Sequence, residues 1–356
     1  MMSVALIALS ILWLGLIAYA VLGGADFGAG IWNLFAIGPQ AKRQSQLINK
    51  ALGPVWEANH VWLIFLIVGL FSVFPPAFAI LSIALFVPLT IALIGIVLRG
   101  SAFIFRTYAI DTAAPTTRWW SRVFMTASLV TPFFLGASAA AVASGKIEAT
   151  SGNVQTDLGS AWTTPFALTI GAMAISLCAA IAAVYLTVEA HNDHDESLAE
   201  AYRLRAIIAG AVTAVLGALG LLLSPSEAPL LWQGLLSRAL PVVIATMLIG
   251  LATAASLFYR RYSLARILII LETAFLLGSW GLSQYPYIIP PHVTIDNAAN
   301  DPNVIMVLLI SIGIGMVLIL PALYYLFSVF KLPTPAPGLE KKEEKNAGEV
   351  SQEKSN

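Results

Sequence analysis

Charged side chains are scarce in this sequence of 356 residues. Asp, Glu, Lys and Arg together make up 11% of it, while hydrophobic residues make up 58%. A soluble domain contains about 25% charged residues, so the composition excludes an ordinary soluble globular protein. The apolar residues also occur in long runs, and about 20 such residues span a bilayer as a helix. The composition therefore predicts an all-α, polytopic membrane protein.

Cysteine and histidine are scarce as well. The one cysteine, Cys178, excludes a disulfide within the chain and a cysteine-based metal cluster. Of the four histidines only His60 lies well inside a predicted helix, so two histidines of this chain cannot hold a haem between them. Neither a Walker sequence nor a dinucleotide-binding glycine fingerprint occurs, which argues against ATP-driven transport by this chain alone. We expect no metal or cofactor site made by this chain's own side chains, and no nucleic-acid partner.

Apolar runs separated by charged or turn residues predict nine transmembrane helices packed as helix bundles. They lie at 4–25, 52–74, 77–99, 121–143, 162–188, 204–223, 239–258, 264–284 and 303–330. Residues 1–331 are accordingly expected to form one polytopic transmembrane domain. Residues 332–356 are rich in Pro, Lys and Glu and poor in apolar side chains, which predicts a disordered, charged cytoplasmic tail.

The basic residues divide unevenly between the two sides of the predicted bundle. When the connections between spans are numbered in order, the odd ones and the tail hold all 19 Lys and Arg residues except Lys146 and Arg238. Arg99 is counted here with the third connection, at the end of the predicted span 77–99. Because cytoplasmic loops are enriched in Lys and Arg, we expect the N-terminus outside and the C-terminus in the cytoplasm.

A polar block opens the second predicted helix. It contains Trp56, Glu57, Asn59 and His60 within residues 53–64. A charged side chain at mid-bilayer costs about 2.5–3.5 kcal/mol, so ionisable residues there are candidates for function. Glu57 is predicted to accept protons, with Trp56, Asn59 and His60 as supporting residues. The alternative is that Glu57 only caps its own helix, since negative charge is favoured at a helix N-terminus.

Asp26 lies in a glycine-rich block at the end of the first predicted helix. Gly24 and Gly28 have the spacing of small residues that lets membrane helices approach closely. Two interpretations stay open: a packing seam with a solvated Asp26 at its edge, or a carboxylate held at a tight helix interface. In the second, Asp26 and Glu57 form a proton-accepting pair, because burial and a like charge both favour a protonated carboxyl. Glu272, near the middle of the eighth predicted helix, is a further supporting candidate and is expected to be protonated or bonded across a helix interface.

The blocks Tyr19–Gly30 and Gly53–Trp62, together with Ser283–Pro290, resemble subunit II of the cytochrome bd quinol oxidases, including the cyanide-insensitive branch. The similarity extends over roughly residues 10–330. The nine-helix arrangement with an outer N-terminus fits the same family.

The resemblance implies a complex of the bacterial cytoplasmic membrane that oxidises quinol and reduces oxygen to water. It implies that haems b and d are held by a haem-bearing subunit I, with which this chain pairs. A small single-helix subunit and a bound quinone or lipid are further partners that the family suggests. The chain itself is implied to supply part of the proton path from the cytoplasm, through Glu57 and Asp26. It departs from many relatives, which have an Asp at the position of Gly23, so Asp26, Glu57 or bound water would have to cover that step.

Two other functions stay open from the residues alone. A proton-coupled secondary transporter would use Asp26, Glu57 and Glu272 as carriers. Such proteins often show inverted repeats and interrupted helices, which are not evident in this sequence. A scaffold subunit would stabilise a complex without a proton role.

Overall fold

The structure is a computed structural model that describes residues 4–107, 115–150, 153–154 and 157–331. The predicted tail, 332–356, lies outside the described residues. The chain divides into two compact units, Met1–Ile310 and Ser311–Asn356, and the sites discussed below all lie in the first.

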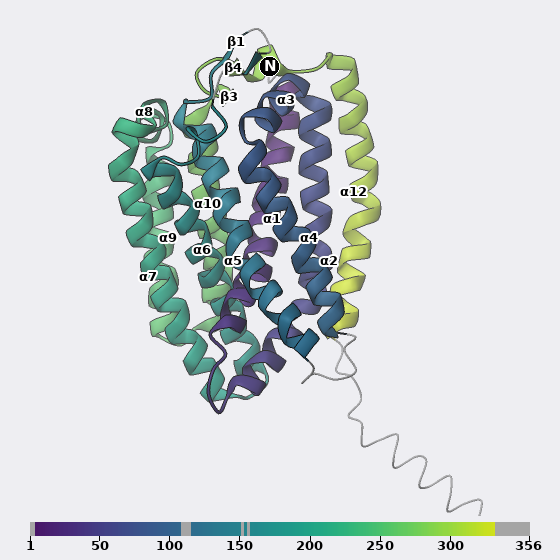
Figure 1. Cartoon of the computed structure of the whole chain (residues 1–356), viewed down its shortest axis with the longest axis vertical. Helices are drawn as coiled ribbons and strands as arrows, with labels where there is room; N and C mark the ends of the chain where they lie inside the picture. Colours follow the sequence, from purple (N-terminus) through teal and green to yellow (C-terminus); the bar gives the residue numbers. More distant parts are fainter. Residues whose placement is uncertain (1–3, 108–114, 151–152, 155–156, 332–356) are drawn as a thin grey trace, which may run out of the picture. The chain divides into compact units, whose positions relative to one another are not determined.

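The described residues are mainly helical, and the long helices of the first unit lie side by side (Figure 1). The helices are α1 (Val4–Leu34), α2 (Ala41–Val73), α3 (Pro75–Ala84), α4 (Phe86–Thr107), α5 (Pro115–Ser144), α6 (Pro165–Asn192), α7 (Glu196–Glu227), α8 (Pro229–Leu236), α9 (Leu240–Phe258), α10 (Tyr262–Gln284), α11 (Ile295–Ala298) and α12 (Pro302–Lys331). Two short antiparallel pairs are formed by β1 (Ala149–Thr150) with β2 (Asn153–Val154), and by β3 (Tyr287–Ile289) with β4 (Val293–Thr294).

The number of membrane spans agrees with the sequence prediction. Within the described residues, eight helices are long and apolar enough to cross a membrane. A ninth span results if Ala58–Val73 of α2 and the following α3, which are bent by 118°, are taken as one broken span. The all-α membrane fold is thus confirmed, whereas the side on which each terminus lies stays a prediction.

One predicted boundary is wrong, and it matters for the site. The expected span 77–99 is divided in the structure, because α3 ends at Ala84 and α4 starts at Phe86. Since α4 continues to Thr107, Arg99 lies inside a helix and is 2% exposed, instead of belonging to a loop. The apolar side chains on both sides of the break hid it from a hydropathy pattern.

Prolines and capping side chains determine where several helices begin. Pro75 starts α3, a position where its missing N–H costs no hydrogen bond. The Thr164 hydroxyl accepts a hydrogen bond from the Ala167 N–H at 3.1 Å and caps α6. The Asp195 carboxylate accepts one from the Leu198 N–H at 3.2 Å and caps α7. Side-chain oxygens satisfy helix N–H groups that have no partner within the helix.

Helix α1 packs against α2, α5, α6 and α10 in the first unit. Its small residues allow close contact. A Cβ atom added to Gly28 would lie 1.9 Å from the Cys178 carbonyl oxygen of α6, and one added to Gly24 would lie 2.8 Å from Ile181. The predicted close approach at Gly24 and Gly28 is therefore confirmed, with α6 as the partner helix.

Candidate functional site

Asp26 and Asn59, two of the residues predicted from the sequence, meet inside the helix bundle. Asp26 on α1 is 1% exposed and Asn59 on α2 is 2% exposed. The Asn59 side-chain N–H donates a hydrogen bond to Asp26 Oδ2 at 2.7 Å. Asp26 is thus a carboxylate held at a tight helix interface, and the interpretation as a solvated residue at the edge of a packing seam is wrong.

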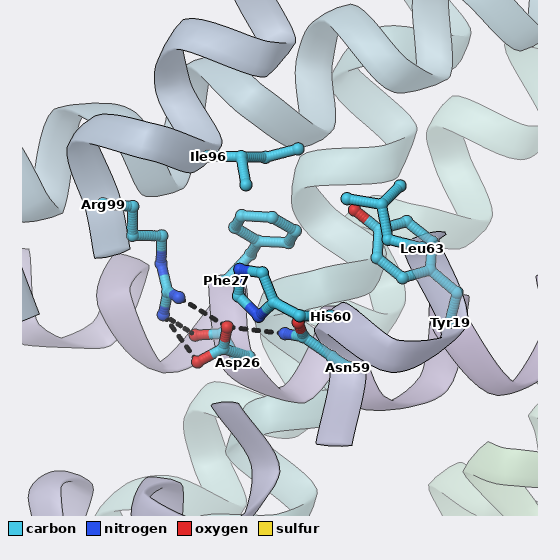
Figure 2. Close-up of a pocket in the computed structure, with 8 residues that line it drawn as sticks. All are labelled: Tyr19, Asp26, Phe27, Asn59, His60, Leu63, Ile96 and Arg99. Carbon is cyan, nitrogen blue, oxygen red and sulfur yellow. Dashed lines mark hydrogen bonds and ion pairs between the residues drawn. The ribbon is translucent and has the colours of Figure 1, made fainter. Parts of the chain in front are cut away.

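A buried arginine from α4 forms an ion pair with Asp26 (Figure 2). Arg99 Nη2 donates to Asp26 Oδ1 at 2.7 Å and to the Asp26 backbone carbonyl at 2.8 Å, while Nη1 donates to Oδ2. Arg99 Nε donates to the Ser128 hydroxyl of α5 at 2.9 Å. The charge on Asp26 is therefore compensated by a guanidinium.

Two aromatic rings enclose the guanidinium. The Arg99 Cζ atom lies 5.1 Å from the centre of the Phe27 ring and 4.6 Å from that of Phe124. Ring faces attract a cation, so both rings stabilise the charge of Arg99. With Asp26, Asn59 and Ser128, these contacts join α1, α2, α4 and α5 in one buried polar network.

Sequence reasoning missed Arg99 and Ser128 as members of this site. The signal available was that the apolar pattern continues beyond Arg99 through Phe103, Ile104 and Phe105, which places the arginine inside a span. A charged residue inside a span nearly always pairs with another polar group.

A small cavity of about 10 Å³ lies next to this network, and it has room for about one water molecule. Its lining is Tyr19, Asp26, Phe27, Asn59, His60, Leu63, Ile96 and Arg99 (Figure 2). Among the described residues, nothing forms a hydrogen bond with the buried Tyr19 hydroxyl.

The residues around His60 do not fit a haem. A cavity of about 10 Å³ is far below the several hundred Å³ of an ordinary cofactor pocket. In the part of the chain that the structure describes, no group of three or more His, Cys, Asp and Glu side chains is placed to hold a metal ion.

The remaining predicted residues are Trp56, Glu57 and Glu272. The side chains of Trp56 and Glu57 lie outside the described part, although their backbone belongs to α2, just before Asn59. Glu272 on α10 faces α9, where a Cβ atom added to Gly250 would lie 3.0 Å from its Oε1. The Thr253 hydroxyl of α9 also contacts the Glu272 carboxyl, so Glu272 is bonded across a helix interface, one of the two states expected.

The connection between α6 and α7 carries a second polar cluster. The Arg43 guanidinium of α2 forms an ion pair with Asp195. Burial raises the pKa of Asp195, but hydrogen bonds from Ser197 and the Leu198 N–H and the charge of Arg43 outweigh it, so the pKa lies below its ordinary value. This cluster joins the start of α2 to the α6–α7 connection.

Comparisons of sequence and of structure with known proteins all match the same family. The family model described as cytochrome bd terminal oxidase subunit II matches residues 4–330. A Bacillus subtilis (strain 168) protein named for a cytochrome bd menaquinol oxidase subunit II is 24% identical over 335 residues, which is 92% of this chain and 95% of the relative. The cytochrome bd ubiquinol oxidase subunit 2 of the same organism is 34% identical over 133 residues, covering 35% of this chain and 37% of the relative. A chain from the structure of bd oxidase from Geobacillus thermodenitrificans matches with a TM-score of 0.74 and 25% identity, covering 94% of this chain and 100% of that one.

Proposed function

Because the chain belongs to the cytochrome bd terminal oxidase subunit II family, we propose that it carries protons from the cytoplasm toward the oxygen-reducing site of its complex. Membership makes the chain a subunit of a bd-type quinol oxidase, a membrane-bound oxidoreductase of the respiratory chain. The secondary transporter, which the residues alone left open, is thereby set aside.

The complex contains haem, and the proposal places haems b and d in a haem-bearing subunit I that pairs with this chain. The small cavity beside His60 supports the assignment of the haems to the partner subunit, because no porphyrin fits in this cavity. A small single-helix subunit, a bound quinone or lipid, and location in the bacterial cytoplasmic membrane belong to the same proposal.

The proton path proposed here runs through Glu57 and Asp26. His60 follows Glu57 by three residues on α2 and lines the cavity beside Asp26, to which Asn59 donates a hydrogen bond. A carboxylate is a group that takes up and releases protons, and a helix brings residues of neighbouring turns into reach. The buried network at Asp26, with a water-sized cavity beside it, is the observation that carries the proposal.

Arg99 gives Asp26 a defined part in this path. Its guanidinium offsets the cost of an ionised carboxylate inside the bundle, and a hydrogen-bonded pair is the form in which buried charges are tolerated. Glu57 is the proposed acceptor of protons, and the Asp26–Arg99 pair supplies fixed charges and hydrogen-bonding groups along the next step.

The test is the purified complex with Glu57→Gln or Asp26→Asn, and Glu272→Gln as a matched control. Each change replaces one carboxyl group by an amide, but Glu272 faces α9 instead of the network. Oxygen consumption and proton uptake should fall by an order of magnitude or more for Glu57→Gln, while haem content stays constant. Wild-type rates in Glu57→Gln at full haem content would contradict the proposal.

A scaffold role without proton transfer is the second candidate, and one observation favours it. Both carboxylate oxygens of Asp26 already accept hydrogen bonds from Arg99 or Asn59, as in a purely structural clamp. In that case Asp26→Asn lowers haem content and oxygen consumption together, and Glu57→Gln lowers neither.

The orientation with the N-terminus outside and the C-terminus in the cytoplasm is also part of the proposal, since it directs the path inward from the cytoplasm. It is supported by the uneven distribution of Lys and Arg along the sequence. A fluorescent protein that matures only in the cytoplasm, fused to the C-terminus, should be fluorescent. Activity of an alkaline phosphatase fusion at the same place would reverse the orientation.

A further inference from the structure

The hydroxyl of Tyr19 is a buried polar group that the proposed path does not use. Tyr19 lies on α1, seven residues before Asp26 and therefore on nearly the same helix face, and it is 9% exposed. Among the described residues its hydroxyl has no hydrogen-bond partner. Buried hydroxyl groups nearly always bond to protein or to ordered water.

The cavity next to Tyr19 has the size and the lining of a water site. Its volume of about 10 Å³ is close to the minimum that one water molecule needs. Asn59, His60 and Arg99 line it together with Tyr19, so polar groups surround a space otherwise bounded by apolar side chains. Figure 2 shows Tyr19 beside Leu63, with His60 and Asn59 between it and the Asp26–Arg99 pair.

A water molecule there would satisfy the Tyr19 hydroxyl and meet the two to four polar partners that a buried water requires. It would also connect the Tyr19 hydroxyl to the hydrogen-bonded network of Asp26 and Asn59. Tyr19 is the one tyrosine among the residues that line the cavity. Tyr19→Phe removes only its hydroxyl oxygen and therefore isolates the contribution of this group.

We propose that the cavity among Tyr19, Asn59 and His60 binds one water molecule, and that Tyr19 is the residue that holds this water in the proton path. This inference rests on the proposed function for the role of the water, but not for its binding. Tyr19 acts here as a positioning residue: it fixes the water by one hydrogen bond and undergoes no net chemical change.

The test compares Tyr19→Phe with Tyr202→Phe in the purified complex. Tyr202 on α7 is a matched control because its hydroxyl is also buried, and it does not line the cavity. Cryo-electron microscopy maps that resolve ordered water should show a peak within hydrogen-bonding distance of Tyr19 Oη in the wild type and in Tyr202→Phe. The peak should be lost or displaced in Tyr19→Phe.

Two results would overturn the inference: a wild-type map with well-resolved Tyr19, Asn59 and His60 but no such peak, or an unchanged peak in Tyr19→Phe. If Tyr19→Phe does not assemble, the wild-type map alone decides. Where the variants assemble with full haem content, proton uptake during oxygen reduction should fall several-fold in Tyr19→Phe only. If the water is present but Glu57→Gln reduces oxygen at the wild-type rate, the water site stands and the proton path is refuted. If Glu57→Gln is slow but the wild type shows no water at Tyr19, the proton path stands and the water site is refuted.

Discussion

Arg99 and Asp26, which are 73 residues apart in the sequence, form a buried ion pair with both side chains 2% exposed. The guanidinium binds both carboxylate oxygens and the backbone carbonyl of Asp26. The pair therefore fixes α4 against α1, and its two charges compensate each other.

Replacing Arg99 by Met should destabilise the subunit by about 3–5 kcal/mol, because it leaves the Asp26 carboxylate buried without a counter-charge. The double variant Asp26→Asn with Arg99→Met should be more stable than Arg99→Met alone, since no charge then remains unpaired. Thermal denaturation of the purified complex, followed by haem release, measures both.

The control for this prediction is Arg43→Met at the exposed pair with Asp195, whose side chains are 54% and 21% exposed. An exposed pair contributes at most about 1 kcal/mol. Equal stability of Arg99→Met and Arg43→Met would show that the buried pair is not a structural contact.

The sequence predicted the individual polar residues better than their partners. Asp26 and Asn59 were recognisable because each is a polar residue in an apolar run. Arg99 was not, because the end of an apolar run does not show where a helix ends, and the pairing of α4 with α1 is decided by tertiary packing. The identity of the helix opposite Gly28 was hidden for the same reason, since a small-residue spacing predicts close approach without naming Cys178 of α6.

Gly28→Ala should weaken assembly, because the new Cβ atom would lie 1.9 Å from the Cys178 carbonyl oxygen and must push α1 and α6 apart. Overpacking of this kind costs about 1–3 kcal/mol. Gly210→Ala is the matched control, as a Cβ atom there meets nothing within 4 Å. The yield of haem-containing complex and its thermal stability should fall for Gly28→Ala only, and a fall in both variants would point to a general intolerance of alanine.

The stabilisation that Asp195 provides should depend on pH below about 4, near the ordinary pKa of an aspartate. Burial raises the pKa of Asp195, but Ser197, the Leu198 N–H and Arg43 together lower it. A group whose pKa is lower in the folded state stabilises fully above its unfolded pKa, and this is lost as the pH falls through the folded value.

Two variants separate the charge of Asp195 from its capping role. Asp195→Asn keeps an N-cap but removes the charge, so it should be less stable than wild type at pH 7 and approach wild type as the pH falls to 3, whereas Asp195→Ala should lose about a further 1 kcal/mol at both pH values. The measurement is the difference in thermal stability from wild type between pH 7 and pH 3. If the difference for Asp195→Asn stays constant over this range, the carboxylate does not contribute through its charge.

Glu272→Gln should change the stability of the complex by less than about 1 kcal/mol and its oxygen consumption by less than about twofold. The reason is that a neutral amide replaces a carboxyl that is expected to be neutral. In the described structure Glu272 forms no ion pair, and its neighbours are Gly250 and Thr253 of α9. An ionised carboxylate there would cost about 2.5–3.5 kcal/mol in a bilayer. Gly250→Val should by contrast displace the Glu272 side chain from the α9–α10 contact, since a Cβ atom added at Gly250 would lie 3.0 Å from Glu272 Oε1. Thermal stability of the complex distinguishes the two, and a loss of several kcal/mol in Glu272→Gln would mean that the carboxyl is charged and paired with a partner in the assembled complex.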